Sequence, residues 1–248
     1  MGSRTSGKAG IACRCEARRR GWLRAAVAHC SALAFAGWLA APVAVHAQGA
    51  SAATANARTP PANAKTLLVV GDSLSAEYGI ARGTGWVALL DKRLAAERLP
   101  WRVVNASVSG DTTSGGRSRL PALLREHKPQ VVIIELGGND ALRGLPLSMT
   151  EANLAEMTRQ SKAASARVLL VGMAVPPNYG RAYGESFMAV FPKVARAEGA
   201  ALVPFLLAGI AEGPLAEAMF QPDRIHPRAE AHPRLLDNVW STLRPLLR

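Results

Sequence analysis

The chain has 248 residues, of which 49% are hydrophobic and 19% are charged, and it contains three cysteines. This composition excludes a largely disordered chain, and three cysteines are too few for a disulfide-stabilised scaffold. The formal charge of +12 would suit a protein that binds nucleic acid or a membrane surface, so its distribution along the chain decides its meaning.

Half of the net charge lies in the first 47 residues, which hold seven basic residues and one acidic residue. There, a basic stretch precedes the apolar run Ala25 to Val45, and the run leads to a small-residue cleavage pattern that ends at Ala47. This order predicts a signal peptide over residues 1–47 and an exported protein, periplasmic or secreted. An uncleaved membrane anchor is the alternative, which Pro42 disfavours. All three cysteines lie in this leader, so the mature protein would contain none.

Residues 48–64 are rich in Ala, Thr, Asn and Pro and have no apolar period, which predicts a flexible linker. The remaining residues, 65–248, suit a single domain. In chain order, the apolar patterns predict a strand over 66–70, a helix over 86–99, a strand over 102–105, a helix over 113–127, a strand over 131–136, a helix over 151–164, a strand over 168–171, a helix over 181–198, a strand over 202–203 and a last helix over 228–246. This alternation predicts an α/β fold with a parallel sheet covered on both faces.

Ligands of such folds bind beyond the carboxyl ends of the strands, where this sequence carries the groups that acyl transfer needs. Ser73 follows the first strand and would be the nucleophile. His226 would be its base, and Asp223, three residues earlier, would orient the imidazole. The backbone N–H groups of Ser73 and Gly110 and the side-chain amide of Asn139 would form the oxyanion hole.

Each of these motifs also has a simpler interpretation. Ser73 could cap a helix, and residues 137–140 could form a turn. Asp223, His226 and His232 could bind a metal ion, but no third ligand has tight helical spacing, so we expect neither a metal nor another cofactor. A G-x-S-x-G motif is excluded, because no glycine stands two residues after Ser73.

Four blocks in order carry a family resemblance: GDSLS at 71–75, the segment around Gly110, GGND at 137–140 and DxxHP at 223–227. Together they resemble the GDSL-type, or SGNH, hydrolases. Their extent points to the thioesterase I / protease I / lysophospholipase subgroup, whose members are often called arylesterases. The resemblance implies a flavodoxin-like three-layer α/β/α sandwich with a five-stranded parallel sheet.

The same resemblance implies a set of substrate-binding residues. Within it, residues 142–147 would form a mobile loop that closes over a bound acyl chain, and two later residues would lie near the substrate cleft. The set is Leu142, Arg143, Gly144, Leu145, Pro146, Asn178 and Tyr179. Three positions depart from the subgroup pattern and should affect substrate preference: Glu77 and Ala141 each replace a glycine, and Arg224 replaces a small residue.

The function that follows from the resemblance is a serine esterase for carboxylic esters and thioesters, of the acyl-CoA thioesterase, arylesterase or lysophospholipase type. Two alternatives remain, a carbohydrate O-acetylesterase of the same superfamily and a non-catalytic lipid-binding or surface-binding domain. Basic residues outside the leader are scattered, so we expect no nucleic-acid partner. We expect a monomer that acts on small acyl esters, thioesters or lysophospholipids, with transient contact with a membrane surface.

Overall fold

The computed structural model describes residues 63–212 and 216–248. These described residues belong to one compact unit. The predicted signal peptide and most of the predicted linker lie outside the described residues. Within the part of the chain that is described, no helix has both the length and the apolar character needed to cross a membrane.

Five parallel strands form one sheet in the order β2-β1-β3-β4-β5. They are β1 (Lys65–Gly71), β2 (Trp101–Asn105), β3 (Val131–Glu135), β4 (Arg167–Val171) and β5 (Ala201–Val203). Each lies within one residue of its predicted bounds. The central strands β1, β3 and β4 are the apolar runs that are buried on both faces. The five-stranded parallel α/β fold is therefore confirmed, and the strand order is that of flavodoxin.

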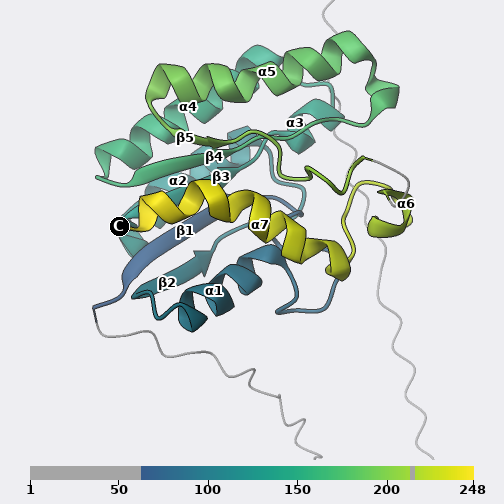
Figure 1. Cartoon of the computed structure of the whole chain (residues 1–248). Helices are drawn as coiled ribbons and strands as arrows, with labels where there is room; N and C mark the ends of the chain where they lie inside the picture. Colours follow the sequence, from purple (N-terminus) through teal and green to yellow (C-terminus); the bar gives the residue numbers. More distant parts are fainter. Residues whose placement is uncertain (1–62, 213–215) are drawn as a thin grey trace, which may run out of the picture. The chain divides into compact units, whose positions relative to one another are not determined.

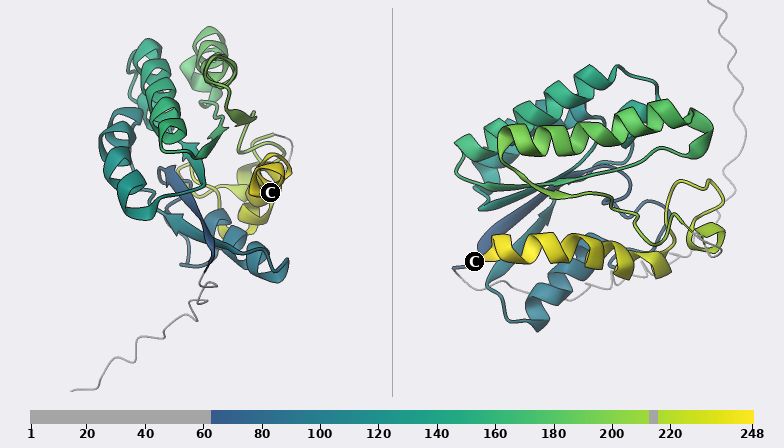
Figure 2. Two further views of the ribbon diagram at one scale, coloured as in Figure 1. Left: turned by 90° about the vertical axis from the view of Figure 1, so that its left-hand side faces the viewer. Right: turned by 45° about the horizontal axis from the view of Figure 1, so that its top comes forward.

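Helices cover both faces of the sheet (Figures 1 and 2). One face carries α1 (Trp86–Ala96) and α7 (His232–Leu243), which pack against each other. The other face carries α2 (Thr113–His127), α4 (Leu147–Ala163) and α5 (Arg181–Glu198). The strand order reverses after β2, so the right-handed connections place α1 and α2 on opposite faces of the sheet. A crevice forms where they separate, at the carboxyl ends of β1 and β3.

Large apolar side chains from the strands and from both helix layers fill the core. Trp86 and Phe187 are fully buried, and the Phe187 ring meets Phe191 edge to face with centroids 5.3 Å apart. Trp101, also buried, donates its indole N–H to the carbonyl of Leu247 at 3.2 Å, which anchors the C-terminus. Burial of each such side chain stabilises the fold by about 1.5–3 kcal/mol.

The helix ends differ from the prediction in three places. Helix α1 ends at Ala96 instead of residue 99, because Arg98 has a left-handed φ of +55°. Helix α4 begins at Leu147, directly after Pro146, four residues before its predicted start. The predicted last helix is divided into a short 3₁₀ segment, α7 and a final 3₁₀ turn, η2 (Ala229–Ala231), α7 (His232–Leu243) and η3 (Arg244–Leu247).

Short elements also appear that the periodicity does not predict: α3 (Gly138–Leu142), η1 (Pro177–Tyr179) and α6 (Ala216–Met219). Two helices reach into the expected mobile loop, residues 142–147, because Leu142 ends α3 and Leu147 begins α4. Ser73 does not open a regular helix, since turns follow it. Runs of three to five residues are too short to show an apolar period.

The close approach of β4 and β5 can be tested by a substitution at Gly172, with Gly184 in α5 as the control. A Cβ at Gly172 would lie 2.1 Å from the backbone carbonyl oxygen of Pro204, so Gly172→Ala requires a strand to shift. We expect this substitution to lower the free energy of unfolding by about 1–3 kcal/mol. Gly184 lies inside α5, where a Cβ would first meet Val175 at 3.6 Å, so Gly184→Ala should raise it by up to ~1 kcal/mol. Urea denaturation measures both changes, and equal effects would contradict the packing argument.

Candidate active site

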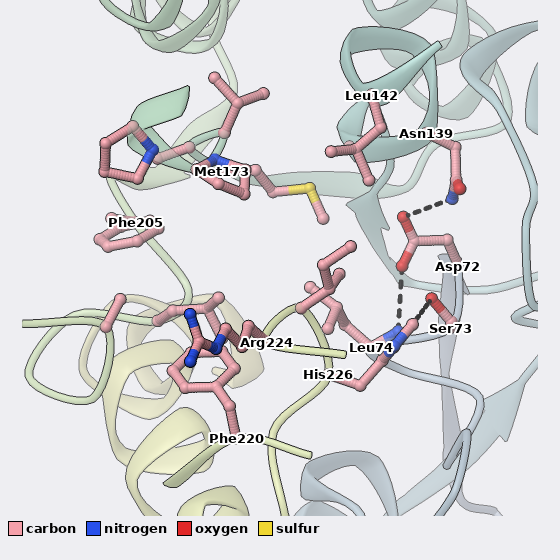
Figure 3. Close-up of a pocket in the computed structure, with 18 of the residues that line it drawn as sticks. Asp72, Ser73, Leu74, Asn139, Leu142, Met173, Phe205, Phe220, Arg224 and His226 are labelled. Carbon is pink, nitrogen blue, oxygen red and sulfur yellow. Dashed lines mark hydrogen bonds between the residues drawn. The ribbon is translucent and has the colours of Figure 1, made fainter. Parts of the chain in front are cut away.

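Ser73 lies in the tight turn that follows β1. Asp72 shapes this turn, since its Oδ1 accepts the backbone N–H of Leu74 at 3.0 Å. Beneath the turn, Glu135 at the end of β3 accepts the hydroxyl of Ser75 at 2.6 Å. A Cβ on Gly71 would lie 2.6 Å from the same carboxyl oxygen of Glu135, so only glycine fits at the end of β1. The turn presents the half-buried Ser73 to a cavity (Figure 3).

Ser73, His226 and Asp223 are brought together in one line of hydrogen bonds. The Ser73 hydroxyl lies 2.8 Å from Nε2 of His226, a residue 153 positions away in the chain (Figure 3). Nδ1 of His226 lies 2.7 Å from Oδ2 of Asp223. The other oxygen of Asp223 accepts the backbone N–H groups of Ile225 and His226 at 2.9 and 3.0 Å. A single short loop thus aims the carboxylate at the imidazole, as the three-residue spacing suggests.

The ionised form of Asp223 is favoured by its hydrogen bonds. Partial burial by itself would raise the pKa of Asp223, but the N–H donors of His226 and Ile225 outweigh it and hold that pKa below its usual value. A carboxylate at this position accepts the Nδ1 proton, which leaves Nε2 free to accept a proton from Ser73. The ring of Tyr78 packs against the imidazole of His226 in a tilted arrangement, with centroids 4.4 Å apart.

The three expected oxyanion donors lie at the ends of three neighbouring strands. Ser73 follows β1, and Asn139, in α3 after β3, also lines the cavity. Gly110 lies after β2 with a left-handed φ of +79°, and its carbonyl accepts the guanidinium of Arg143 at 2.8 Å. The segment of Gly110 is tied to the end of β1, because the N–H of Val108 donates to the Gly71 carbonyl at 3.0 Å.

Two buried carboxyl groups lie under the nucleophile. Asp72 is 2% exposed, and burial raises its pKa to about 6. Glu135 is fully buried, and this burial together with the nearby Asp72 raises its pKa well above the usual value. Oε1 of Glu135 has no hydrogen-bond partner among the described residues. A protonated Glu135 beside an ionised Asp72 is the arrangement that these shifts favour.

The cavity beside Ser73 has a volume of about 720 Å³ and a largely apolar lining. Most of its apolar side chains come from the segment after β4, the segment after β5 and the approach to His226, among them Met173, Val175, Pro176, Pro177, Phe205, Leu207, Phe220 and Ile225. This size is in the range of about 300–1,000 Å³ that is typical of small-molecule sites. The site can therefore hold an apolar group next to the serine hydroxyl.

One of the seven expected substrate-binding residues, Leu142, lies in the described lining of this cavity. The other six lie outside that lining: Arg143, Gly144, Leu145, Pro146, Asn178 and Tyr179. Tyr179 still contacts the predicted loop, residues 142–147, because its hydroxyl donates to the carbonyl of Leu142 at 3.2 Å. The hydroxyl of Tyr183 donates to the neighbouring carbonyl of Ala141 at 3.1 Å.

The three departures from the family pattern have different surroundings. Glu77 accepts the N–H groups of Gly83 and Gly85 at 2.9 and 2.8 Å, so it organises the turn before α1. Ala141 is buried in the core. Arg224 lines the cavity and pairs with Glu217 at 2.8 Å.

His232, one of the three residues of the alternative metal site with Asp223 and His226, has a hydrogen-bond partner elsewhere. His232 is buried, and its Nδ1 accepts the backbone N–H of Trp86 at 3.0 Å, which satisfies the first turn of α1. Burial lowers the pKa of His232, so the neutral form that accepts this bond is favoured. Among residues 63–212 and 216–248, no group of three potential metal ligands is present.

Sequence reasoning missed two kinds of residue here. Glu135 had a signal, because it is the one acid in the apolar run 131–136. Tyr78 and the cavity lining had none, since isolated apolar residues in loops look the same whether or not they line a cavity.

The raised pKa of Glu135 predicts a pH-dependent stability. In the unfolded chain a glutamate loses its proton near its usual pKa of 4.5, whereas folded Glu135 keeps its proton to higher pH. The folded state thus binds more protons above pH 4.5, and stability falls as the pH rises. Between about pH 5 and about pH 8, the melting temperature of the parent should fall more steeply than that of Glu135→Gln. Parallel melting curves would contradict the assignment.

Comparisons with known proteins identify the family of the chain. The model of the GDSL-like Lipase/Acylhydrolase family matches residues 69–234. Esterase TesA of Pseudomonas aeruginosa is 56% identical over 189 residues, which cover 76% of this chain and 92% of that protein. Thioesterase 1/protease 1/lysophospholipase L1 of Escherichia coli K12 is 43% identical over 186 residues, with coverages of 75% and 86%.

A solved structure extends the agreement to the fold. The crystal structure of TesA superposes with a TM-score of 0.71 and 55% sequence identity, and the match covers 73% of this chain and 99% of that one. The family match includes the GDSLS, GGND and DxxHP blocks that build the site. The chain belongs to the GDSL-like lipase/acylhydrolase family.

Proposed function

We propose that this protein is a serine hydrolase of carboxylic esters and thioesters that works through an acyl-enzyme on Ser73. The observation that carries the proposal is the hydrogen-bonded line Ser73–His226–Asp223 at the wall of an apolar cavity. The names of the relatives, esterase, thioesterase and lysophospholipase, support the same class of reaction.

In the first half of the reaction, Oγ of Ser73 attacks the carbonyl carbon while Nε2 of His226 takes its proton. Asp223 stabilises the resulting imidazolium across the 2.7 Å contact with Nδ1. The N–H groups of Ser73 and Gly110 and the amide of Asn139 donate to the oxygen that becomes negative. His226 then gives its proton to the departing alcohol or thiol, and the acyl group remains on Ser73.

In the second half, His226 removes a proton from a water molecule, and the water oxygen attacks the acyl carbon. The same three donors stabilise the second tetrahedral intermediate. When this intermediate breaks down, His226 returns the proton to the Ser73 oxygen and the carboxylic acid is released. Every proton is thus transferred through Nε2, the nitrogen that lies 2.8 Å from Ser73.

We propose that the apolar cavity holds the acyl chain of the substrate. Its lining contains Met173, Val175 and Phe205, which offer an acyl chain no hydrogen bonds but much apolar area. Each methylene buried there contributes about 0.8 kcal/mol, which is about fourfold in kcat/KM. Longer acyl chains are therefore favoured over acetyl until the cavity is full. A carbohydrate O-acetylesterase, the second candidate, would use little of this volume.

The place of action is a further part of the proposal. The basic stretch, the apolar run and the small-residue pattern of residues 1–47 support export through a cleaved signal peptide. We propose a monomeric periplasmic or secreted enzyme that meets lysophospholipids and other small acyl esters at membrane surfaces.

The catalytic roles predict a large loss of activity on substitution. Ser73→Ala and His226→Ala should each lower kcat for p-nitrophenyl esters by roughly 10³-fold or more. A fluorophosphonate probe should label the parent and fail to label Ser73→Ala. Circular dichroism checks that the variants fold. A folded Ser73→Ala with near-normal turnover would remove the assignment, and a parent that stays unlabelled would favour a non-catalytic binding domain.

The acyl-chain role of the cavity predicts a length-dependent change in specificity. Ala174 lines the cavity, so Ala174→Phe should fill part of it. We expect kcat/KM for esters of about 8 to 12 carbons to fall by at least tenfold, with little change for acetyl esters, which serve as the internal control. A p-nitrophenyl ester series measures this. A parent that prefers acetyl esters, or a variant that loses all lengths equally, would contradict the acyl-chain role.

A further inference from the structure

Asp72 makes more contacts than the nucleophile turn requires. One carboxylate oxygen, Oδ1, accepts the N–H of Leu74 at 3.0 Å, and this is the bond by which the side chain shapes the turn. The other oxygen, Oδ2, accepts Nδ2 of Asn139 at 3.2 Å, across the crevice between β1 and β3 (Figure 3). A carboxylate that is only 2% exposed costs free energy to bury, and these two bonds compensate for it.

The bond to Asn139 determines which way its amide points. A carboxylate only accepts hydrogen bonds, so the NH₂ edge of the amide, and not its oxygen, faces Asp72. The NH₂ group has two N–H donors in one rigid plane. Once Asp72 accepts one of them, the rotation of the amide is fixed and the second N–H remains for another acceptor. Asn139 and Ser73 line the same cavity, where that acceptor would be the substrate oxygen.

We infer that Asp72 is a positioning residue, whose carboxylate holds the Asn139 amide so that its second N–H is aimed at the substrate carbonyl oxygen. The inference rests on the proposed function, because it assumes that Asn139 donates to the oxyanion. It gives Asp72 a role in transition-state stabilisation that is separate from the proton transfers of His226. An orientation fixed before the reaction begins costs nothing at the moment when charge develops.

The surroundings of Asp72 support a charged acceptor. Glu135 accepts the backbone N–H of Asp72 at 3.3 Å, and its raised pKa keeps it neutral beside Asp72. The pKa of Asp72 is about 6, where burial and Asp111 raise it and the Leu74 N–H, His226 and Asn139 lower it. Near neutral pH most molecules therefore carry an ionised Asp72, and its bond to Asn139 is charge-assisted.

The substitution Asp72→Asn tests this role, because both partners of the carboxylate are donors. The new amide has one oxygen for two N–H groups, so its own NH₂ must face either Leu74 or Asn139. We expect kcat to fall about 10- to 100-fold with less than about a threefold change in KM, since the loss arises in the transition state.

A double-mutant cycle with Asn139→Ala separates the possible routes of action. Asn139→Ala should lower kcat by about 10²–10³-fold, and adding Asp72→Asn to it should cost less than about threefold more. Glu77→Gln is the matched control, an acid of the same turn that binds Gly83 and Gly85 and not Asn139. The small effect of Glu77→Gln on kcat should be the same in the parent and in Asn139→Ala.

Two outcomes of the cycle would overturn the inference. If the losses from Asp72→Asn and Asn139→Ala multiply, Asp72 acts through the turn or through His226 instead. If Asn139→Ala keeps full activity, its proposed role as an oxyanion donor is removed, and the role of Asp72 with it, while the Ser73 and His226 variants still test the hydrolase itself.

A measurement on the unmutated enzyme covers the case in which Asp72→Asn does not fold. With ¹⁵N-labelled asparagine, the Asn139 side-chain signal is identified by its loss in Asn139→Ala. One of its two amide protons should be protected from solvent exchange, and its shift should follow the titration of Asp72 near pH 6. Equal exchange of both protons, with no shift in that range, would overturn the inference.

Discussion

The register between β1 and β3 is the constraint on which the site depends. The two strands pair in parallel with Gly71 opposite Glu135, so the segments that follow them leave the sheet at the same level. Ser73 and Asn139, which are 66 positions apart in the sequence, therefore enter the same crevice. A shift of one residue would reverse the faces of the side chains in β1 and separate the nucleophile from the amide. The alternate placement of α1 and α2 keeps this edge open to a ligand.

The acids at this edge of the sheet act in different ways. Asp72 accepts hydrogen bonds from two segments, and Glu135 supports the turn from below. Asp140 accepts the N–H and the hydroxyl of Thr113 and so caps the start of α2. Burial makes each carboxyl group costly, and each one lies at the end of β1 or β3 or in the turn or short helix that follows. Polar groups that lower local stability are expected where a site must be preorganised.

Some of this arrangement could be predicted from the sequence. Buried β-branched runs fix the strands, and the short spacing between Asp223 and His226 makes their contact a local property. The contact between Asp72 and Asn139 is not local, because it depends on which strands are neighbours and in what register. Helix ends were less predictable, since Pro146 and the left-handed Arg98 act through backbone geometry instead of apolar period.

The cavity shows why chemistry and specificity separate in this fold. The reacting groups lie after β1 and β3 and in the His226 loop, whereas much of the lining comes from segments after β4 and β5 that take no part in proton transfer. Arg224 belongs to both regions, because it stands between Asp223 and His226 and lines the cavity.

The stability of its loop does not explain the arginine at 224. A left-handed φ of +59° costs a residue with a Cβ about 1 kcal/mol. The pair with Glu217 is exposed on both sides, and such pairs return little free energy. What the arginine adds to the site is an ion pair with Glu217 on the wall of a largely apolar cavity, which Glu217 also lines.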